Sequence, residues 1–168
     1  MIVIRNNKEN NILGFKFFNT YESNNDESNI WSNICMDDDY EIIGKLLIPK
    51  INLETNILSQ SNDDTLKISV ARLCGPKMVN TQGNLCIAGH NYINSAMFGN
   101  LYKLELNDKI YITDYKNDIL EYTVYNIFKT SPKDISCILP SDDENIELTL
   151  ITCTITGLDR LIIKARHI

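Results

Sequence analysis

The sequence predicts a mainly-β fold in which an antiparallel sheet closes, or nearly closes, on itself. From residue 40 onward, segments rich in Val, Ile, Tyr and Thr recur along the chain, as is typical of strands. Helical patterns are few and short, and the turn signals between strands are local. Short strands joined by local turns favour a barrel-like sheet over alternating layers of helices and strands.

The first 39 residues differ in texture from the rest of the chain. They are rich in Asn, Ser, Asp and Glu, which bury little apolar surface. An amphipathic pattern over residues 28–34 predicts one short helix, and the acidic run at residues 37–39 indicates a solvated linker rather than a metal site. We therefore expect residues 1–39 to be a polar extension or linker, and residues 40–168 to form one folded domain.

The first half of this domain is expected to contain two strands and a helix. Residues 41–48 and 51–58 read as strands, and the proline between them supplies no donor to a strand ladder. A helix is expected over residues 61–74, because the polar run at its start resembles a helix N-terminus. Leu66 and Val70, four residues apart, would share one face of that helix.

The second half is expected to contain five strands and two short helical pieces. Apolar and β-branched residues cluster between turn residues, and alternate early in the segment that begins at Ile146. The helical turns are expected within residues 97–104 and 131–139. The strands are expected at residues 84–90, 109–113, 119–128, 146–153 and 160–168.

Charge and cysteine content exclude several classes of protein. The net charge of −6 argues against a nucleic-acid partner, which requires clustered Lys and Arg. No C-x-x-C pair occurs, so a structural zinc site is not expected. A chain of 168 residues folds without disulfide bridges, and we read all five cysteines as free thiols. They are Cys35, Cys74, Cys86, Cys137 and Cys153.

No targeting or membrane segment is evident. No stretch approaches the roughly 18 apolar residues of a transmembrane helix, and residues 1–11 lack the apolar core of a signal peptide. Taken alone, the chain reads as a soluble protein, although a chain cut after a membrane anchor would look the same.

Two histidines are present, and one of them is placed to act. His167 adjoins the C-terminus, whereas His90 follows Gly89 at the end of an apolar strand. Gly89 lets the backbone approach a neighbour closely. A lone histidine is more often structural than catalytic, so His90 indicates a catalytic site only if other suitable residues lie beside it.

Cys153 and Arg160 form the second half of a candidate site. Cys153 ends a predicted strand, and residues 154–159 separate it from Arg160, which opens the next. In a hairpin the two residues stand roughly opposite each other and point to the same face. A thiolate is a nucleophile that nearby positive charge favours, an imidazole can protonate a leaving amine, and a guanidinium can stabilise an oxyanion. Spacing alone leaves open that Arg160 is an ordinary surface residue.

The local sequences resemble those of the sortase family. The run Thr149-Leu150-Ile151-Thr152-Cys153, followed by Arg160-Leu161-Ile162-Ile163-Lys164-Ala165, is similar to the sortase signature strand, loop and arginine. The run Ala88-Gly89-His90-Asn91 resembles the sortase histidine motif. The order His, Cys, Arg also fits. So do the start Ile43-Gly44-Lys45-Leu46-Leu47-Ile48-Pro49-Lys50 and the turn Leu106-Asn107-Asp108-Lys109-Ile110.

This resemblance implies an eight-stranded sortase-type β-barrel with a few short helices, and a cysteine transpeptidase activity. Cys153 is expected to be the nucleophile, His90 the acid that protonates the leaving amine, and Arg160 the residue that stabilises the oxyanion. Asn91 and Thr152 are expected to help bind the substrate. The chemistry implies no metal and no organic cofactor.

The resemblance also implies partners and a location. The substrates would be surface or pilin proteins that carry a C-terminal sorting signal. The acceptor would be an amine of a peptidoglycan precursor or of a pilin. The enzyme would act at the extracellular face of the cytoplasmic membrane of a Gram-positive bacterium.

The sortase subclass and two other functions stay open. Asn91, residues 97–101 and the brief loop at residues 154–159 resemble class B, whereas the compact stretch between Phe128 and Ile146 resembles class D or A. A surface cysteine peptidase would pass the acyl group to water instead of an amine. A non-enzymatic β-barrel binding module would use the same fold without chemistry.

Overall fold

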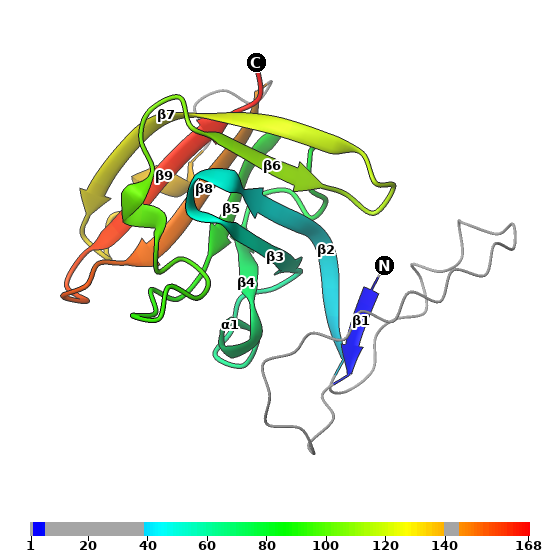
Figure 1. The fold of residues 1–168 in the computed structure, drawn as a ribbon, viewed down its shortest axis with the longest axis horizontal. Coiled ribbons are helices and arrows are strands. Elements are labelled where there is room, and N and C mark those ends of the chain that lie inside the picture. Colours follow the sequence, from blue (N-terminus) through cyan, green and yellow to red (C-terminus); the bar gives the residue numbers. More distant parts are fainter. Residues whose placement is uncertain (1, 6–38, 140–144) are drawn as a thin grey trace, which may run out of the picture.

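The structure is a computed structural model, which describes residues 2–5, 39–139 and 145–168. Eight of its strands form a closed ring, because β2 pairs with β3 along one edge and with β6 along the other. Around the ring the order is β2-β3-β4-β5-β8-β9-β7-β6, and all pairings are antiparallel except β3–β4 and β5–β8. Figure 1 shows this arrangement. The predicted eight-stranded, mainly-β barrel is thus confirmed.

The elements that surround this ring are short. Among the described residues, four one-turn helices lie in its connections: η1 (Pro49–Ile51), α1 (Thr65–Ile68), η2 (Leu101–Lys103) and η3 (Ser136–Ile138). The strands of the ring are β2 (Asp39–Ile48), β3 (Leu53–Leu58), β4 (Val70–Cys74), β5 (Gly83–Ala88), β6 (Lys109–Thr113), β7 (Ile119–Thr130), β8 (Ile146–Cys153) and β9 (Arg160–Arg166).

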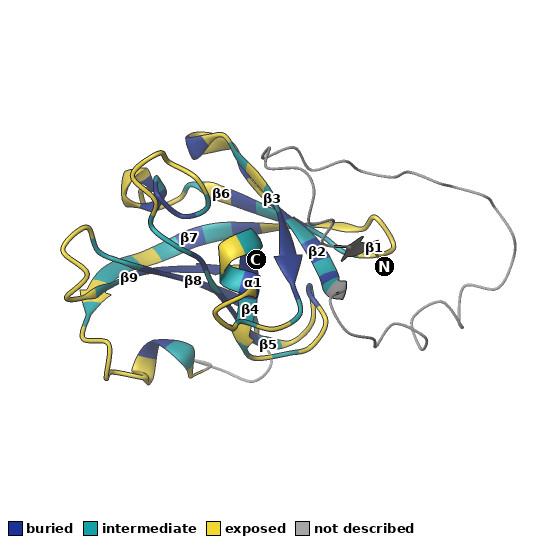
Figure 2. Cartoon of the chain, turned by 90° about the horizontal axis from the view of Figure 1, so that it is seen from below, coloured by how far each residue is buried: buried dark blue, intermediate teal, exposed yellow. Residues whose placement is uncertain are grey.

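Alternate residues of each strand fill the interior of the barrel. On β8, Leu148 and Leu150 point into the main core, whereas Ile151 belongs to a second apolar cluster on the outer face. Figure 2 shows dark, buried colour along the strands and exposed colour over most connecting loops.

Tyr122 is fully buried in this core, and its hydroxyl donates to Oδ1 of Asn80 at 3.0 Å. Burial raises the pKa of this tyrosine. Burying each large aliphatic side chain contributes about 1.5–3 kcal/mol.

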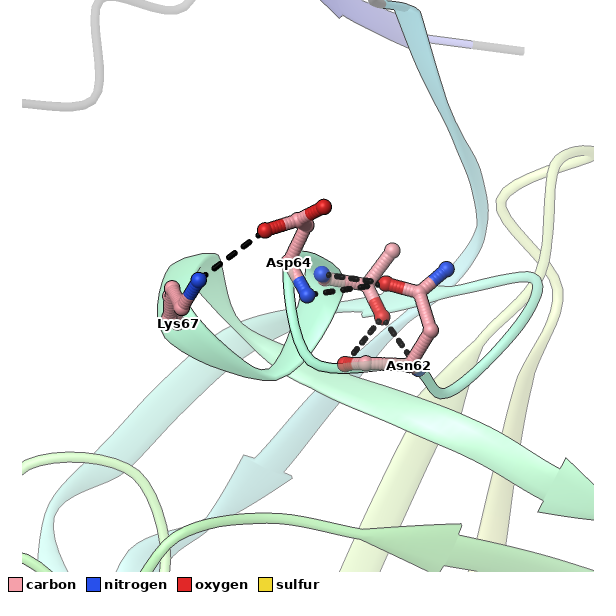
Figure 3. A network of polar contacts seen from close by, with 4 residues as sticks. Asn62, Asp64 and Lys67 are labelled. Atoms are coloured by element: carbon pink, nitrogen blue, oxygen red, sulfur yellow. Dashed lines mark hydrogen bonds and ion pairs between the residues drawn. The ribbon is translucent and has the colours of Figure 1, made fainter.

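The prediction of a helix over residues 61–74 is wrong beyond its first turn. The start is as expected: Oδ1 of Asn62 accepts from the backbone N–H groups of Asp64 (3.0 Å) and Thr65 (2.9 Å), and Lys67 contacts Asp64 (Figure 3). The helix α1 then ends at Ile68, and Val70 begins strand β4. Tertiary pairing overrides the helical pattern, because Val70 is fully buried between β3 and β5.

The other boundaries lie close to those expected. Two predicted strands, residues 109–113 and 146–153, match β6 and β8. The strand expected over residues 51–58 begins only at Leu53, because η1 occupies residues 49–51. The predicted helical segments at residues 97–104 and 131–139 each contain a single turn, η2 and η3.

One strand was not predicted. Strand β1 (Ile2–Arg5) pairs with residues 39–42 of β2, on the edge that β6 uses farther along. In Figure 1, β1 lies beside the end of β2 that extends beyond the barrel. The short helix expected over residues 28–34 lies outside the described residues. None of the helices in the described ranges has the length and apolar character to span a membrane.

Candidate active site

Cys153 and Arg160 are brought face to face by the hairpin of β8 and β9. Cys153 is the last residue of β8 and Arg160 the first of β9, and the two are directly paired across the strands. The loop between them closes on itself, with the N–H of Thr154 donating to the carbonyl of Asp159 at 2.9 Å. Gly157 accommodates the turn with φ +72°. The sequence-based expectation for this pair is therefore met in the backbone.

His90 reaches the same place through a parallel pairing. Strand β5 runs beside β8, with Ala88 opposite Ile151, and the N–H of Gly89 donates to the carbonyl of Ile151 at 3.1 Å. The hydroxyl of Thr152 donates to the carbonyl of Gly89 at 2.7 Å. His90 follows directly, so it lies beside the end of β8 that carries Cys153.

A second tie follows on the other side of His90. Nδ2 of Asn91 donates to the carbonyl oxygen of Cys153 at 2.8 Å. His90 is thus bracketed by two residues that each hydrogen-bond to one of the last two residues of β8. In Figure 1, the loop after β5 and the β8–β9 hairpin project from the same end of the barrel.

Close packing holds the histidine segment in place. Gly89 is buried, and a Cβ built on it would lie 2.7 Å from Cδ2 of Phe98 and 2.8 Å from Cγ1 of Val70. The N–H of Phe98 donates to the carbonyl of His90 at 3.0 Å. The glycine therefore allows the close approach that its position in the sequence predicted, and Phe98 fixes the backbone on both sides of His90.

The three candidate side chains make few polar contacts with the described part of the protein. Cys153, His90 and Arg160 are all half-buried. Within the described ranges, the thiol and the imidazole have no hydrogen-bond partner, and the guanidinium donates only to the neighbouring carbonyl of Asp159, at 3.4 Å. The ring of His90 lies 5.2 Å from that of Tyr92, centroid to centroid.

Asn91 and Thr152, the predicted substrate-binding residues, are engaged differently. Both side chains already hydrogen-bond to backbone carbonyls of the site, and Thr152 is only 3% exposed. Their predicted contact with substrate stays a prediction, while these bonds give them a place in holding the site together. Sequence reasoning missed this tie, because it depends on the parallel pairing of strands far apart in the chain. The motif residues flanking His90 and Cys153 were its only signal.

Known proteins match this chain over most of the barrel domain. Residues 46–168 match the family model for the sortase domain. Sortase A of Bacillus anthracis is 32% identical over 117 residues, which are 69% of this chain and 54% of the relative. Sortase A of Listeria monocytogenes is 29% identical over 113 residues. The chain spans about half the length of these two relatives.

Solved structures show the same likeness. The sortase D5 transpeptidase of Clostridium perfringens superposes with a TM-score of 0.69 at 36% identity, covering 76% of this chain and 79% of that one. The pilus-related sortase C of Group B Streptococcus superposes with a TM-score of 0.69 at 28% identity, covering 76% and 68%. Relatives of classes A, C and D all match, so the subclass is not resolved. With its barrel, its strand-end cysteine and arginine, and the match over residues 46–168, this chain belongs to the sortase family.

Proposed function

We propose that this protein is a cysteine transpeptidase that cleaves a C-terminal sorting signal and passes the acyl group to an amine. One observation carries the proposal. Cys153 stands opposite Arg160 across the β8–β9 hairpin, while Asn91 and Gly89 tie the segment of His90 to the same strand end. In this proposal Cys153 is the nucleophile, His90 the acid and Arg160 the permanent cation at this end of the barrel.

The first half-reaction uses all three groups. The thiolate of Cys153 attacks the carbonyl carbon of the scissile peptide bond, and the carbonyl oxygen becomes an oxyanion. The guanidinium of Arg160 stabilises this charge, since arginine keeps its proton and offers several donors. The C–N bond then breaks, the leaving amine takes a proton from His90, and a thioester to Cys153 remains.

The second half-reaction reverses these roles. An incoming amine attacks the thioester carbonyl and gives a proton to His90, and the thiolate of Cys153 departs. A new amide bond joins the substrate protein to the acceptor. Asn91 and Thr152 hold the backbones of Cys153 and Gly89, so they keep the nucleophile and the acid in register throughout.

The proposed partners are surface or pilin proteins with a sorting signal, and the acceptor is an amine of a peptidoglycan precursor or a pilin. The Group B Streptococcus relative is described as pilus-related, which supports the pilin alternative as a class of substrate. We place the reaction at the extracellular face of a Gram-positive cytoplasmic membrane, as for the family. Residues 40–168 form the catalytic domain in this proposal, and residues 1–39 a polar extension.

The test separates transfer from hydrolysis. The protein is incubated with a panel of sorting-signal peptides, with and without candidate amines, and both products are followed by mass spectrometry. We expect an acyl adduct on Cys153, slow hydrolysis alone and a ligated product when an amine is present. Rapid hydrolysis that no amine diverts would instead establish a peptidase. A protein in which Cys153 neither acylates nor reacts selectively with a thiol probe would be a binding module.

A further inference from the structure

A second group of thiols lies away from Cys153, on strands β4 and β5. Cys74 is directly paired with Cys86 across this antiparallel pair. The pairing depends on a β-bulge: Arg72 pairs with Ile87, but the next paired residue of β4 is Cys74 rather than Leu73. Two residues of β4 thus oppose one of β5. Without this extra residue, Leu73 rather than Cys74 would stand opposite Cys86.

The end of β4 lies unusually close to β5. Gly75 follows Cys74 with φ +91°, and a Cβ built on it would lie 2.0 Å from the carbonyl oxygen of Asn84. Only glycine fits there, so the backbones approach each other closely beside the two cysteines. Directly opposed residues of antiparallel strands have Cα atoms about 4.5–5.5 Å apart, within the span of about 4.4–6.8 Å that a disulfide bridges.

The two sulfurs also share one apolar cluster. Cys86 is fully buried and Cys137 is 6% exposed, while Cys74 is partly buried and packs against the same cluster. Burial raises the pKa of the Cys86 thiol, and the nearby sulfurs of Cys74 and Cys137 raise it further. Among the described residues, no group of three or more His, Cys, Asp or Glu side chains could hold a metal ion. The cluster therefore sets a partly exposed thiol, that of Cys74, against a buried one, that of Cys86.

We propose that Cys74 and Cys86 are an oxidation site that forms a cross-strand disulfide by exchange with a low-molecular-weight disulfide. The thiolate of Cys74, the more accessible of the two, attacks one sulfur of the oxidant and releases its other half as a thiolate. Cys86, whose raised pKa makes this the slow step, then gives its proton to the small thiolate just released, and its sulfur attacks Sγ of Cys74 and releases the second thiol. Two protein thiols lose two hydrogens, and one small disulfide gains them. This chemistry does not depend on the role proposed for Cys153.

The bond would join β4 to the strand that leads to His90. It closes a loop of about a dozen residues, which restricts the unfolded chain. For a chain of this size, we expect the melting temperature to rise by about 5–10 °C.

The experiment uses the full chain with Cys35→Ser and Cys153→Ala, so that neither of these thiols competes. The protein is incubated with oxidised or reduced glutathione, and peptides are mapped under non-reducing conditions by mass spectrometry. We expect a cross-linked peptide that contains Cys74 and Cys86, together with the rise in melting temperature. Reductant should reverse both effects.

Matched variants define what would overturn the proposal. Cys137→Ser should form the same bond. Cys86→Ser should stop at a glutathione adduct on Cys74 and gain no stability. If Cys86→Ser fails to fold, Cys74→Ser at the less buried position gives the same stability readout. A cross-link to Cys137, a lasting adduct on Cys74 while Cys86 is present, or no bond at all would each contradict the pairing.

Discussion

Cys153 and Cys86 lie on the same outer face of neighbouring strands, yet their surroundings differ sharply. Cys86 pairs in register with Thr149 of β8, four residues before Cys153, so the two cysteines are about 13 Å apart along the sheet. Cys86 is fully buried beneath η3 and its apolar neighbours. Cys153 is half-buried at the end of its strand and has no hydrogen-bond partner for its thiol among the described residues.

The difference in exposure between Cys86 and Cys153 follows from their positions, one in the middle of a strand and the other at its end. In the middle of β5, a covering segment and tight packing make a thiol part of the core, where it behaves as a small apolar group. At the end of β8, Cys153 stays partly exposed among the described residues, and Arg160 stands opposite it. The same side chain on the same face is therefore placed to attack a substrate at the strand end, whereas in mid-strand it packs in the core and can react only with a thiol beside it.

The largest effect is expected from exchanging the two cysteines for alanine in turn. Cys153→Ala should abolish turnover, a loss of at least about 10³-fold, because no other group in the proposed mechanism forms the thioester. Cys86→Ala should keep most of the activity and lose stability by about 1 kcal/mol, since a small cavity replaces the sulfur. Peptide cleavage assays and thermal unfolding measure both. Loss of chemistry in well-folded Cys86→Ala would reverse the assignment of the nucleophile.

Arg160→Lys tests whether the cation opposite Cys153 acts by geometry or by charge alone. Lysine keeps the charge but loses the planar fork of donors, so we expect kcat/KM to fall by about 10²–10³-fold. Arg166→Lys, at the other end of β9 and stacked over Tyr125 at 5.1 Å, is the matched control and should retain activity. Near wild-type turnover in Arg160→Lys would show that long-range charge suffices.

Alkylation at different pH values directly compares the reactivity of the Cys153 thiol with that of the Cys86 thiol. The raised pKa of Cys86 means that its thiol stays protonated through neutral and mildly alkaline pH, and its labelling should increase only as the pH rises or the protein unfolds. We expect iodoacetamide at pH 7 to label Cys153 at least about tenfold faster than Cys86. Peptide mapping over time provides the rates. Equal rates for the two cysteines in folded protein would remove the proposed difference.

Gly89→Ala should disturb the end of the barrel that carries Cys153 and His90. It should not disturb the cluster of Cys74, Cys86 and Cys137. The new methyl group would overlap Phe98 and Val70, both buried, so we expect a loss of stability of about 1–3 kcal/mol. Activity should fall as His90 moves. The double variant with Phe98→Leu should recover part of the activity, because a smaller side chain relieves the overlap. Purely additive effects of the two substitutions on stability and activity would argue against the contact.

Deleting residues 1–39 should have the smallest effect. The eight strands of the ring keep their pairings, since of the removed residues only Ile2–Arg5 and Asp39 lie in described strands, and β1 pairs with β2 alone. We expect a folded, active domain with a melting temperature lowered by only a few degrees. A large fall or aggregation would place the segment in the core, whereas a rise in activity would indicate that it covers the substrate site.

The sequence predicts the pairing of Cys153 and Arg160 well because that pairing is local. The two residues are only seven positions apart, and alternation along the strand fixes which face they share. The place of His90 was predicted only through the likeness to a family. Periodicity carries no information about the parallel pairing of β5 with β8, whose partners lie more than sixty residues apart.

Three further features could not be predicted from the sequence, because each depends on pairing with another strand. Val70 and Ala71 fit a helical pattern, but contacts with β3 and β5 draw them into a strand. The bulge at Leu73, which sets Cys74 opposite Cys86, depends on the register between two strands and leaves no mark in the amino-acid pattern. Strand β1 was likewise missed, because its partner edge exists only once β2 is placed.

The candidate active site combines a local strand pairing, β8–β9, with a distant one, β5–β8, and this difference sets an order for folding. Hairpins such as β8–β9 form in about 1–10 μs, whereas pairings between distant segments must first close a long loop and are slower. The Cys153–Arg160 half of the site can therefore assemble early, and His90 joins only when β5 docks along β8. During refolding, catalytic activity should be among the last signals to return, after the spectroscopic signature of β-structure, and it would report that the barrel has closed.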